Sequence, residues 1–187
     1  MNIRPLSLPG VYEISLEPKK DHRGYFMRTF DEKIFAQFGI SRNWVQENQS
    51  QSLKKGTVRG LHFQFPPFSE TKLIRVVKGA IYDVFVDIRA DSPTFGKWGW
   101  IELTEDNYKM VLIPRGFAHG FCTLTDQCEV VYKVDNVYAP EYEGGIRWND
   151  RALNIDWPVD NPVISEKDSK LPTLQEMMEI LQNTKFK

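Results

Sequence analysis

Short apolar runs that alternate with polar residues dominate the middle of the chain. The runs 73–77 and 80–88 are rich in β-branched and aromatic residues and flank a Lys-Gly pair, which predicts a β-hairpin. Side chains alternate along a strand, so each strand has two distinct faces. In the second run this separates Ile81, Asp83, Phe85 and Asp87 from Tyr82, Val84, Val86 and Ile88. We expect one of these faces to pack in the core.

Further strands are predicted at 99–103, 109–113, 120–123 and 129–137, separated by turn-forming residues. Many short strands at such spacing indicate a sandwich or a barrel. Helical periodicity is confined to two segments. Residues 31–38 begin with Asp31 as a predicted N-cap. Residues 174–182 would turn Leu174, Met177, Met178 and Leu181 inward.

Composition narrows the class of protein. The chain of 187 residues is long enough for one domain with a substantial core. Its 24 basic and 25 acidic residues give a formal charge of -1, which shows no bias toward nucleic acid or an anionic membrane. No apolar run reaches about 18 residues, and prolines interrupt residues 1–10. We therefore expect a cytosolic protein without a membrane span or signal peptide.

The two cysteines, Cys122 and Cys128, flank a polar segment that we interpret as a turn between two strands. A disulfide between them is geometrically possible. Reduced, half-buried thiols are the favoured interpretation for a cytosolic protein.

Candidate chemistry gathers around glycines and short apolar runs. His62 lies in the segment RGLHFQ, Lys72 follows ten residues later, and His119 lies in the segment PRGFAHGF. Histidine titrates near neutrality, and lysine stabilises an oxyanion. If these side chains point into a barrel, they suit an enzyme that moves protons on a phosphorylated ligand.

Eight segments carry a resemblance that covers nearly the whole chain. They are residues 21–26 (DHRGYF), 46–50 (QENQS), 59–64 (RGLHFQ), 72–73 (KL), 91–96 (DSPTFG), 114–121 (PRGFAHGF), 148–150 (WND) and 165–168 (SEKD). Together, in this order and spacing, they resemble the dTDP-4-dehydrorhamnose 3,5-epimerase family.

The resemblance implies an all-β fold, a cupin-like jelly-roll β-barrel with a few short peripheral helices. We expect a single epimerase domain over 1–187, with an N-terminal arm and strands in 1–55, the barrel core in 56–140 and a C-terminal wrap in 141–187. The family resemblance further implies a homodimer with exchange of the N-terminal arm. It also implies activity on a nucleotide-diphosphate-linked 4-keto-6-deoxy sugar without a cofactor or metal, in polysaccharide biosynthesis.

The resemblance also implies catalytic roles. A ketone at C4 acidifies the C–H bonds at C3 and C5, but the carbanion still needs a base, an oxyanion stabiliser and an acid on the opposite ring face. By similarity these are His62, Lys72 and Tyr132. Asp168 would hydrogen-bond the second ring nitrogen of His62 and fix its tautomer. Each has a structural alternative, such as aromatic filling for Tyr132 and a turn cap for Asp168.

Other residues match substrate-contacting positions of the family. Arginine suits a diphosphate because its planar fork pairs with two oxygens. The matched positions are Arg23, Gln46, Asn48, Arg59, His119, Glu143 and Lys167. Ordinary surface charge is an alternative for Lys167, and a turn acid is an alternative for Glu143.

Two positions depart from the family pattern. Arg28 stands where the family usually has a glutamate near the thymine ring of a neighbouring subunit's ligand. A carboxylate accepts the thymine N3–H, whereas a guanidinium only donates. We therefore predict a CDP- or GDP-linked substrate, unless Arg28 turns outward to solvent. Arg115 also replaces a frequent glutamate, and either adds positive potential at the barrel mouth or has no effect.

Three other functions remain open at this point. The first is a metal-dependent enzyme, because cupin barrels often bind a metal and His62, Glu70 and His119 stand near ligand positions. Gln64, however, replaces the usual second histidine. A non-catalytic sugar-nucleotide-binding protein is the second, since fold does not fix function. The third is a nucleotide-sugar 3,4-ketoisomerase. The sequence does not distinguish inversion at C3, at C5 or at both.

Overall fold

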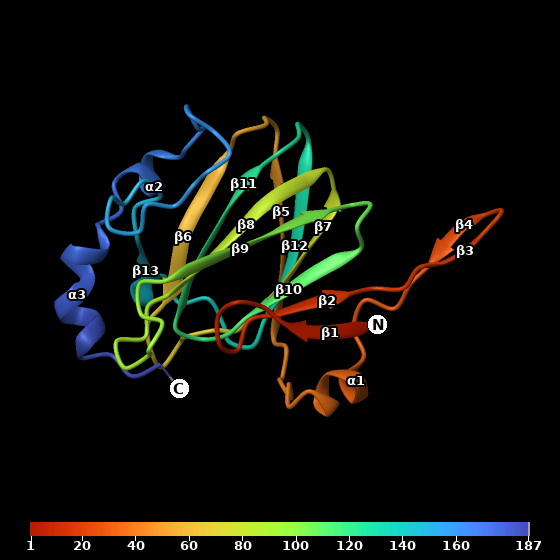
Figure 1. Ribbon diagram of the computed structural model, residues 1–187, viewed down its shortest axis with the longest axis horizontal. Coiled ribbons are helices and arrows are strands. Elements are labelled where there is room, and N and C mark those ends of the chain that lie inside the picture. The colour runs from red at the N-terminus through yellow and green to blue at the C-terminus, as the bar shows by residue number, and fades with distance from the viewer. Residues whose placement is uncertain (187) are drawn as a thin grey trace.

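Two antiparallel β-sheets face each other and enclose the interior of the protein (Figure 1). The computed structural model describes residues 1–186. In spatial order, the first sheet comprises β1 (Asn2–Pro5), β2 (Tyr12–Ser15), β10 (Lys109–Ile113), β7 (Lys72–Lys78), β12 (Cys128–Val134) and β5 (Gln46–Ser52). The second comprises β13 (Glu143–Gly145), β6 (Val58–Gln64), β11 (Phe117–Thr123), β8 (Ala80–Asp87) and β9 (Trp98–Thr104). This is the predicted all-β jelly-roll barrel.

The predicted hairpin between residues 73–77 and 80–88 is wrong. Its two runs form β7 and β8, but β7 pairs with β10 and β12, whereas β8 pairs with β9 and β11. The connection at Gly79, which has a φ of 78°, carries the chain from one sheet to the other. A short turn between two apolar strands has the same sequence pattern in both cases, so the pattern alone did not separate them.

Both faces of β8 are buried, although we expected only one to be core. Ile81 and Phe85 belong to the cluster between the two sheets. Val84 and Val86 belong to a second cluster on the outer face of the second sheet. Helix α3 (Leu174–Gln182) covers that face, and its Leu174, Met177 and Leu181 are buried there. Helix α3 therefore lies on the outside of the barrel (Figure 1).

The two predicted helices are present. Helix α1 (Glu32–Gln37) has Asp31 as its N-cap, and its Phe35 packs in a third cluster with residues from the outer face of the first sheet. Helix α3 has the predicted bounds, but Met178 is only partly buried. The four-residue helix α2 (Glu166–Ser169) and a 3-10 turn at Pro140–Tyr142 were not predicted.

Two strand ends differ from the prediction by three residues each. Strand β11 begins at Phe117, three residues before the predicted start at Gly120. Strand β12 ends at Val134 rather than at residue 137. Asp135 follows β12 directly, and its carboxylate accepts the backbone N–H of Thr71, so this residue leaves the strand pattern to close a loop contact.

The N-terminal region contributes more to the barrel than an arm alone. Strands β1, β2 and β5 belong to the first sheet, whereas β3 (Lys19–Asp21) and β4 (Gly24–Phe26) form a separate hairpin. Figure 1 shows this hairpin projecting away from the barrel. Its Tyr25 and Phe26 are 54% and 69% exposed. Large exposed aromatic side chains on a projecting hairpin are typical of a contact surface.

Cys122 and Cys128 are both free, as expected, but they are fully buried rather than half-buried. Burial raises the pKa of each thiol to about 11. Among residues 1–186, no helix has the length and apolar character needed to cross a membrane.

Candidate active site

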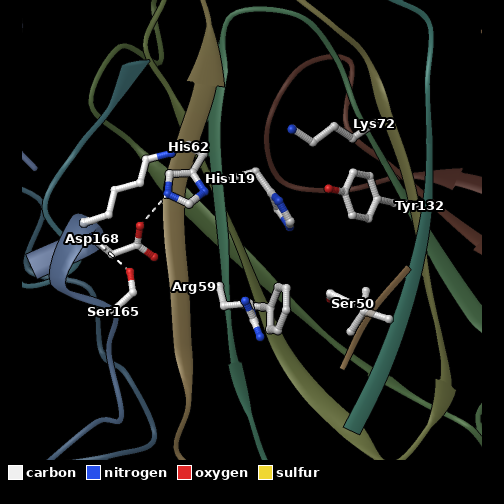
Figure 2. Close-up of a pocket in the computed structure, with 11 residues that line it drawn as sticks. Ser50, Arg59, His62, Lys72, His119, Tyr132, Ser165 and Asp168 are labelled. Atoms are coloured by element: carbon white, nitrogen blue, oxygen red, sulfur yellow. Dashed lines mark hydrogen bonds and ion pairs between the residues drawn. The ribbon is translucent and has the colours of Figure 1, made fainter. Parts of the chain in front are cut away.

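A cavity of about 340 Å³ lies between the two sheets and holds all four side chains that were predicted to be catalytic. Its lining comes from both sheets and from α2, which closes one side (Figure 2). The lining residues are Ser50, Arg59, His62, Lys72, His119, Phe121, Val130, Tyr132, Ser165, Lys167 and Asp168.

His62 and Asp168 form a hydrogen-bonded pair on one wall. The His62 Nε2 lies 2.7 Å from the Asp168 Oδ1, while Oδ2 accepts the Gly60 N–H at 3.0 Å. Ser165 caps α2 by accepting the Asp168 N–H at 3.0 Å, which fixes the position of that residue. Burial raises the pKa of Asp168, but the bonds from His62 and Gly60 outweigh it and hold the pKa below its usual value. Asp168 is thus an ionised partner for His62 near neutral pH.

Lys72 and Tyr132 lie on the opposite wall. They project from β7 and β12 of the first sheet, whereas His62 projects from β6 of the second (Figure 2). The Lys72 Nζ lies 5.8 Å from the centroid of the Tyr132 ring. Because Asp168 occupies the Nε2 of His62, its Nδ1 is the nitrogen left for the cavity. A ligand in the cavity would therefore have a basic nitrogen on one side and a phenol on the other.

His119 is supported by a carboxylate that the sequence analysis did not assign to the site. Its Nε2 lies 2.8 Å from the Oδ2 of Asp83, which is fully buried. Burial raises the pKa of Asp83, although the bond to His119 and the charge of Lys72 act in the opposite direction. The alternation along the strand had placed Asp83 on the same face as Phe85, and this was the only sequence signal available.

The set of residues considered as metal ligands does not form a metal site. Glu70 accepts a hydrogen bond from the Lys72 ammonium at 2.5 Å and another from the Gln64 amide at 3.2 Å. Its carboxylate therefore faces donors rather than His62 and His119. Within the described part of the chain, no three His, Cys, Asp or Glu residues are grouped closely enough to hold an ion.

Arg59 is the one predicted diphosphate ligand from a barrel strand that lines the cavity. Its Nε donates to the Ser52 Oγ at 3.0 Å, and its NH2 donates to the Gln51 carbonyl at 2.9 Å. Gln46 and Asn48 are bonded to each other at 3.0 Å on β5, at positions that alternate with the outward-facing residues of that strand. Gln46 and Asn48 share a face of β5 with Ser50, but only Ser50 of these three lines the cavity.

Glu143 and Lys167 form an ion pair of 2.7 Å. Tyr138 donates to the same Glu143 oxygen at 2.9 Å. Burial raises the pKa of Glu143, but these two donors outweigh it and hold the pKa below its usual value. The hydrogen bond from Lys167 to Glu143 raises the pKa of Lys167. The two predicted ligands are therefore adjacent, and Lys167 lines the cavity.

Arg23 and Arg28 lie outside the cavity of their own chain. Arg23 is on the projecting hairpin and pairs with Asp21 at 2.6 Å. Arg28 pairs with Asp31 at 2.9 Å and its side chain is 65% exposed. The structure of one chain thus brings together the barrel residues of the predicted site but not these two arm residues.

Arg115 has a contact that neither sequence interpretation foresaw. Its guanidinium lies 3.3 Å from the Oδ2 of Asp135, which is 3% exposed. The Oδ1 of Asp135 accepts the N–H of Thr71 at 2.6 Å, immediately before Lys72. Arg115 therefore balances the charge of a buried carboxylate that anchors the start of β7.

The comparisons with known proteins agree with this architecture. The family model for dTDP-4-dehydrorhamnose 3,5-epimerase matches residues 5–176. An enzyme of that name from Shigella flexneri is 47% identical over 171 residues, which are 90% of this chain and 93% of the relative.

Two solved structures also superpose closely on the chain. One, from Bacillus anthracis, is a dTDP-4-dehydrorhamnose 3,5-epimerase with TDP and PPi bound; it has a TM-score of 0.90 and 44% identity, and covers 92% of this chain and 98% of its own. The other is an epimerase from Legionella pneumophila in complex with dTDP-4-keto-L-rhamnose, with a TM-score of 0.91, 38% identity and 96% coverage of both chains. The chain therefore belongs to the dTDP-4-dehydrorhamnose 3,5-epimerase family.

Proposed function

We propose that the chain inverts C3 and C5 of a dTDP-linked 4-keto-6-deoxyhexose through an enolate. The observation that carries the proposal is the placement of the His62–Asp168 pair on one wall of the cavity, with Lys72 and Tyr132 on the opposite wall. Inversion at carbon needs a base on one ring face and an acid on the other.

The protons and electrons balance at each centre. The Nδ1 of His62 takes the proton from C3 or C5, and the electron pair of that C–H bond moves to form a C=C bond while the C4 carbonyl becomes an enolate. The Lys72 ammonium stabilises the enolate oxygen. The Tyr132 hydroxyl then donates its proton to the opposite face of the carbon; the C=C electron pair forms the new C–H bond, the C4 carbonyl re-forms, and Tyr132 is left as a phenolate. Exchange with solvent returns His62 to its neutral form and Tyr132 to its phenol.

The Asp168 carboxylate supports the imidazolium that forms on His62. Its bond to Nε2 fixes the tautomer in which Nδ1 carries the lone pair and faces the cavity. His119, held by Asp83 through its Nε2, is placed to form a hydrogen bond with the sugar.

The names of the relatives are the support for dTDP as the nucleotide of the substrate. The prediction of a CDP- or GDP-linked substrate rested on Arg28 alone, and Arg28 pairs with Asp31 in this chain. Titration calorimetry with dTDP, CDP and GDP tests this directly. We expect dTDP to bind most tightly, and tighter binding of CDP or GDP would restore the earlier prediction.

We further propose that the protein is a homodimer in which each N-terminal arm contributes Arg23 to the partner's cavity. The support is that the hairpin β3–β4 projects from the barrel with exposed aromatic residues, and that Arg23 is 79% exposed and away from its own cavity. A cationic side chain there would add a diphosphate contact to the one that Arg59 offers from the barrel.

Subunit mixing tests the arm exchange. The variant His62→Ala lacks the base but keeps its arm, and Arg23→Ala lacks the arm contact but keeps its barrel. In a mixed dimer with exchanged arms, one cavity contains neither substitution, so activity should return after unfolding and refolding the two variants together. No gain over the separately refolded variants would show that arms are not exchanged.

The epimerase function itself is tested by the product. Purified protein should convert a dTDP-4-keto-6-deoxyhexose to its C3 and C5 epimers, which proton NMR distinguishes by ring coupling constants. Migration of the ketone from C4 to C3, seen in carbon NMR, would indicate a ketoisomerase. Binding without any conversion would indicate a non-catalytic protein. That the reaction takes place in the cytosol stays a prediction.

A further inference from the structure

Glu70 contacts the ammonium of Lys72, which lines the cavity, but is not itself a lining residue. The distance from the Lys72 Nζ to the Glu70 Oε1 is 2.5 Å, and the two side chains are only 12% and 9% exposed. An ion pair this well buried differs from a surface pair, because each charge has lost most of its water and depends on its partner. Removing one partner therefore changes the surroundings of the other strongly.

The Glu70 carboxylate is itself held in place. Its Oε2 accepts the Gln64 amide N–H at 3.2 Å. The two hydrogens of that amide are shared between Glu70, the Phe68 carbonyl at 2.8 Å and the Val137 carbonyl at 3.1 Å, while the Gln64 oxygen accepts the Ala139 N–H at 2.7 Å. Gln64 is 3% exposed. A buried chain of hydrogen bonds thus runs from the segment after β12 through Gln64 and Glu70 to Lys72.

The arrangement requires a carboxylate at position 70. Glu70 receives donors on both oxygens, an ammonium on one and an amide on the other. A glutamine side chain has one oxygen that accepts and one NH2 group that only donates, so in place of Glu70 it would accept from only one of these two groups. The other contact would bring two donors together in a buried site, which is costly.

Lys72 needs this support because its side chain is flexible. A lysine ammonium sits on four methylene groups with many rotamers, and a free chain would spend little time at any one point of the cavity wall. Glu70 takes one of its three N–H groups. The remaining two are available to an oxygen in the cavity.

We propose that Glu70 is a positioning residue that holds the Lys72 ammonium where the enolate oxygen forms. The inference rests on the proposed function, because it concerns the oxyanion stabiliser of that reaction. Glu70 does not contact the substrate and acts through Lys72. Its effect should therefore appear in the rate of enolate formation and should disappear when the lysine is absent.

A double-mutant cycle tests this dependence. The variants are Glu70→Gln, Lys72→Ala and the double variant, and the readouts are KM and the rate of deuterium incorporation at C3 and C5 in heavy water. We expect Glu70→Gln to lower the exchange rate about tenfold with KM within about twofold, and Lys72→Ala to lower it by about 10² or more. In the Lys72→Ala background, Glu70→Gln should change the rate by less than about twofold, because coupled residues are not additive.

A matched control is Glu47→Gln. Glu47 also forms an ion pair with a lysine, Lys133, at 3.0 Å on neighbouring strands, but that pair is exposed and outside the cavity. Its loss should leave the exchange rate and KM unchanged. Thermal unfolding of all variants shows that they are folded at the assay temperature.

Two kinetic results would overturn the proposal. One is an exchange rate for Glu70→Gln within about twofold of the unsubstituted protein. The other is the same fold-loss in both backgrounds, which would mean that Glu70 acts independently of Lys72. Crystal structures of the two proteins separate this failure from failure of the proposed function, since a displaced Lys72 Nζ in Glu70→Gln is visible without turnover. An undisplaced Nζ would contradict the positioning role even if the protein catalysed another reaction.

Discussion

The His62 ring and the Asp168 carboxylate meet at 2.7 Å although 106 residues separate them in the chain. The contact depends on α2, which begins at the Ser165 cap and packs beside β6. Asp168 also accepts the Gly60 N–H from that strand. One carboxylate thus ties the C-terminal wrap to the barrel and selects which ring nitrogen of His62 faces the cavity.

Replacing Asp168 with asparagine should lower the activity strongly and leave the fold intact. The amide oxygen can still accept a hydrogen bond, but the charge that supports the imidazolium is lost and the tautomer is no longer fixed. By analogy with other His/Asp pairs, we expect kcat to fall by about 10²–10⁴-fold. Epimerisation rates with circular dichroism as a fold control measure this. A loss of less than about threefold would remove Asp168 from the proposed mechanism.

Tyr132→Phe should separate proton abstraction from inversion. The base and Lys72 remain, so the C–H proton should still exchange with deuterium from the solvent. Reprotonation from the Tyr132 side should fail, and the starting configuration should be recovered. Proton NMR in heavy water reports exchange and configuration in the same sample. Inversion at the original rate would assign the acid to another residue.

Asp83→Asn should stabilise the folded protein while lowering its activity. Because burial raises the pKa of Asp83, its contribution to stability is present below its unfolded pKa of about 3.9 and is lost as the pH rises through the folded pKa. The amide avoids that loss but alters the charge next to His119. Thermal unfolding from pH 4.5 to 8 should show the variant gaining over the unsubstituted protein as the pH rises. A difference in unfolding temperature between the two proteins that stays constant with pH would contradict the titration of Asp83.

The contribution of Asp87 to stability depends on pH in the opposite direction. Burial raises its pKa, but hydrogen bonds from Arg89, Ser92 and Thr94 outweigh it and hold the pKa below its usual value. Its contribution to stability is therefore present above the unfolded pKa of about 3.9 and lost as the pH falls through the folded value. We expect Asp87→Asn to cost about 3 kcal/mol at pH 7, with the difference shrinking in acid. Urea unfolding at pH 7 and pH 3 measures both values, and equal losses at the two pH values would contradict this.

Local patterns predicted some elements well and others poorly. The strand at 109–113 and the helix at 174–182 have the predicted bounds, because each has a clear apolar period and polar residues at its ends. The link at Gly79 was misassigned because strand order in a two-sheet barrel depends on contacts between distant segments. Helix α2 has only four residues, which is too short for a helical period to appear in the sequence.

The residues of the candidate site likewise fall into those that the sequence predicted and those that it did not. The residues His62, Lys72, Tyr132 and Asp168 were found through the family resemblance, and the structure gathers them around one cavity. Residues that support them were missed, because Glu70 and Asp83 have no motif of their own. The contact of Asp83 with His119 arises only when β8 and β11 pair, and Glu70 reaches Lys72 from two residues away at the start of β7.

The most direct test of the proposed function is proton NMR of the protein with a dTDP-4-keto-6-deoxyhexose in heavy water. The account predicts that the C3 and C5 proton signals disappear with the unsubstituted protein and that epimerised sugar accumulates. With folded His62→Asn, both signals should persist. Persistence of both signals with the unsubstituted protein, or their loss at the same rate with His62→Asn, would contradict the central claim that His62 abstracts these protons.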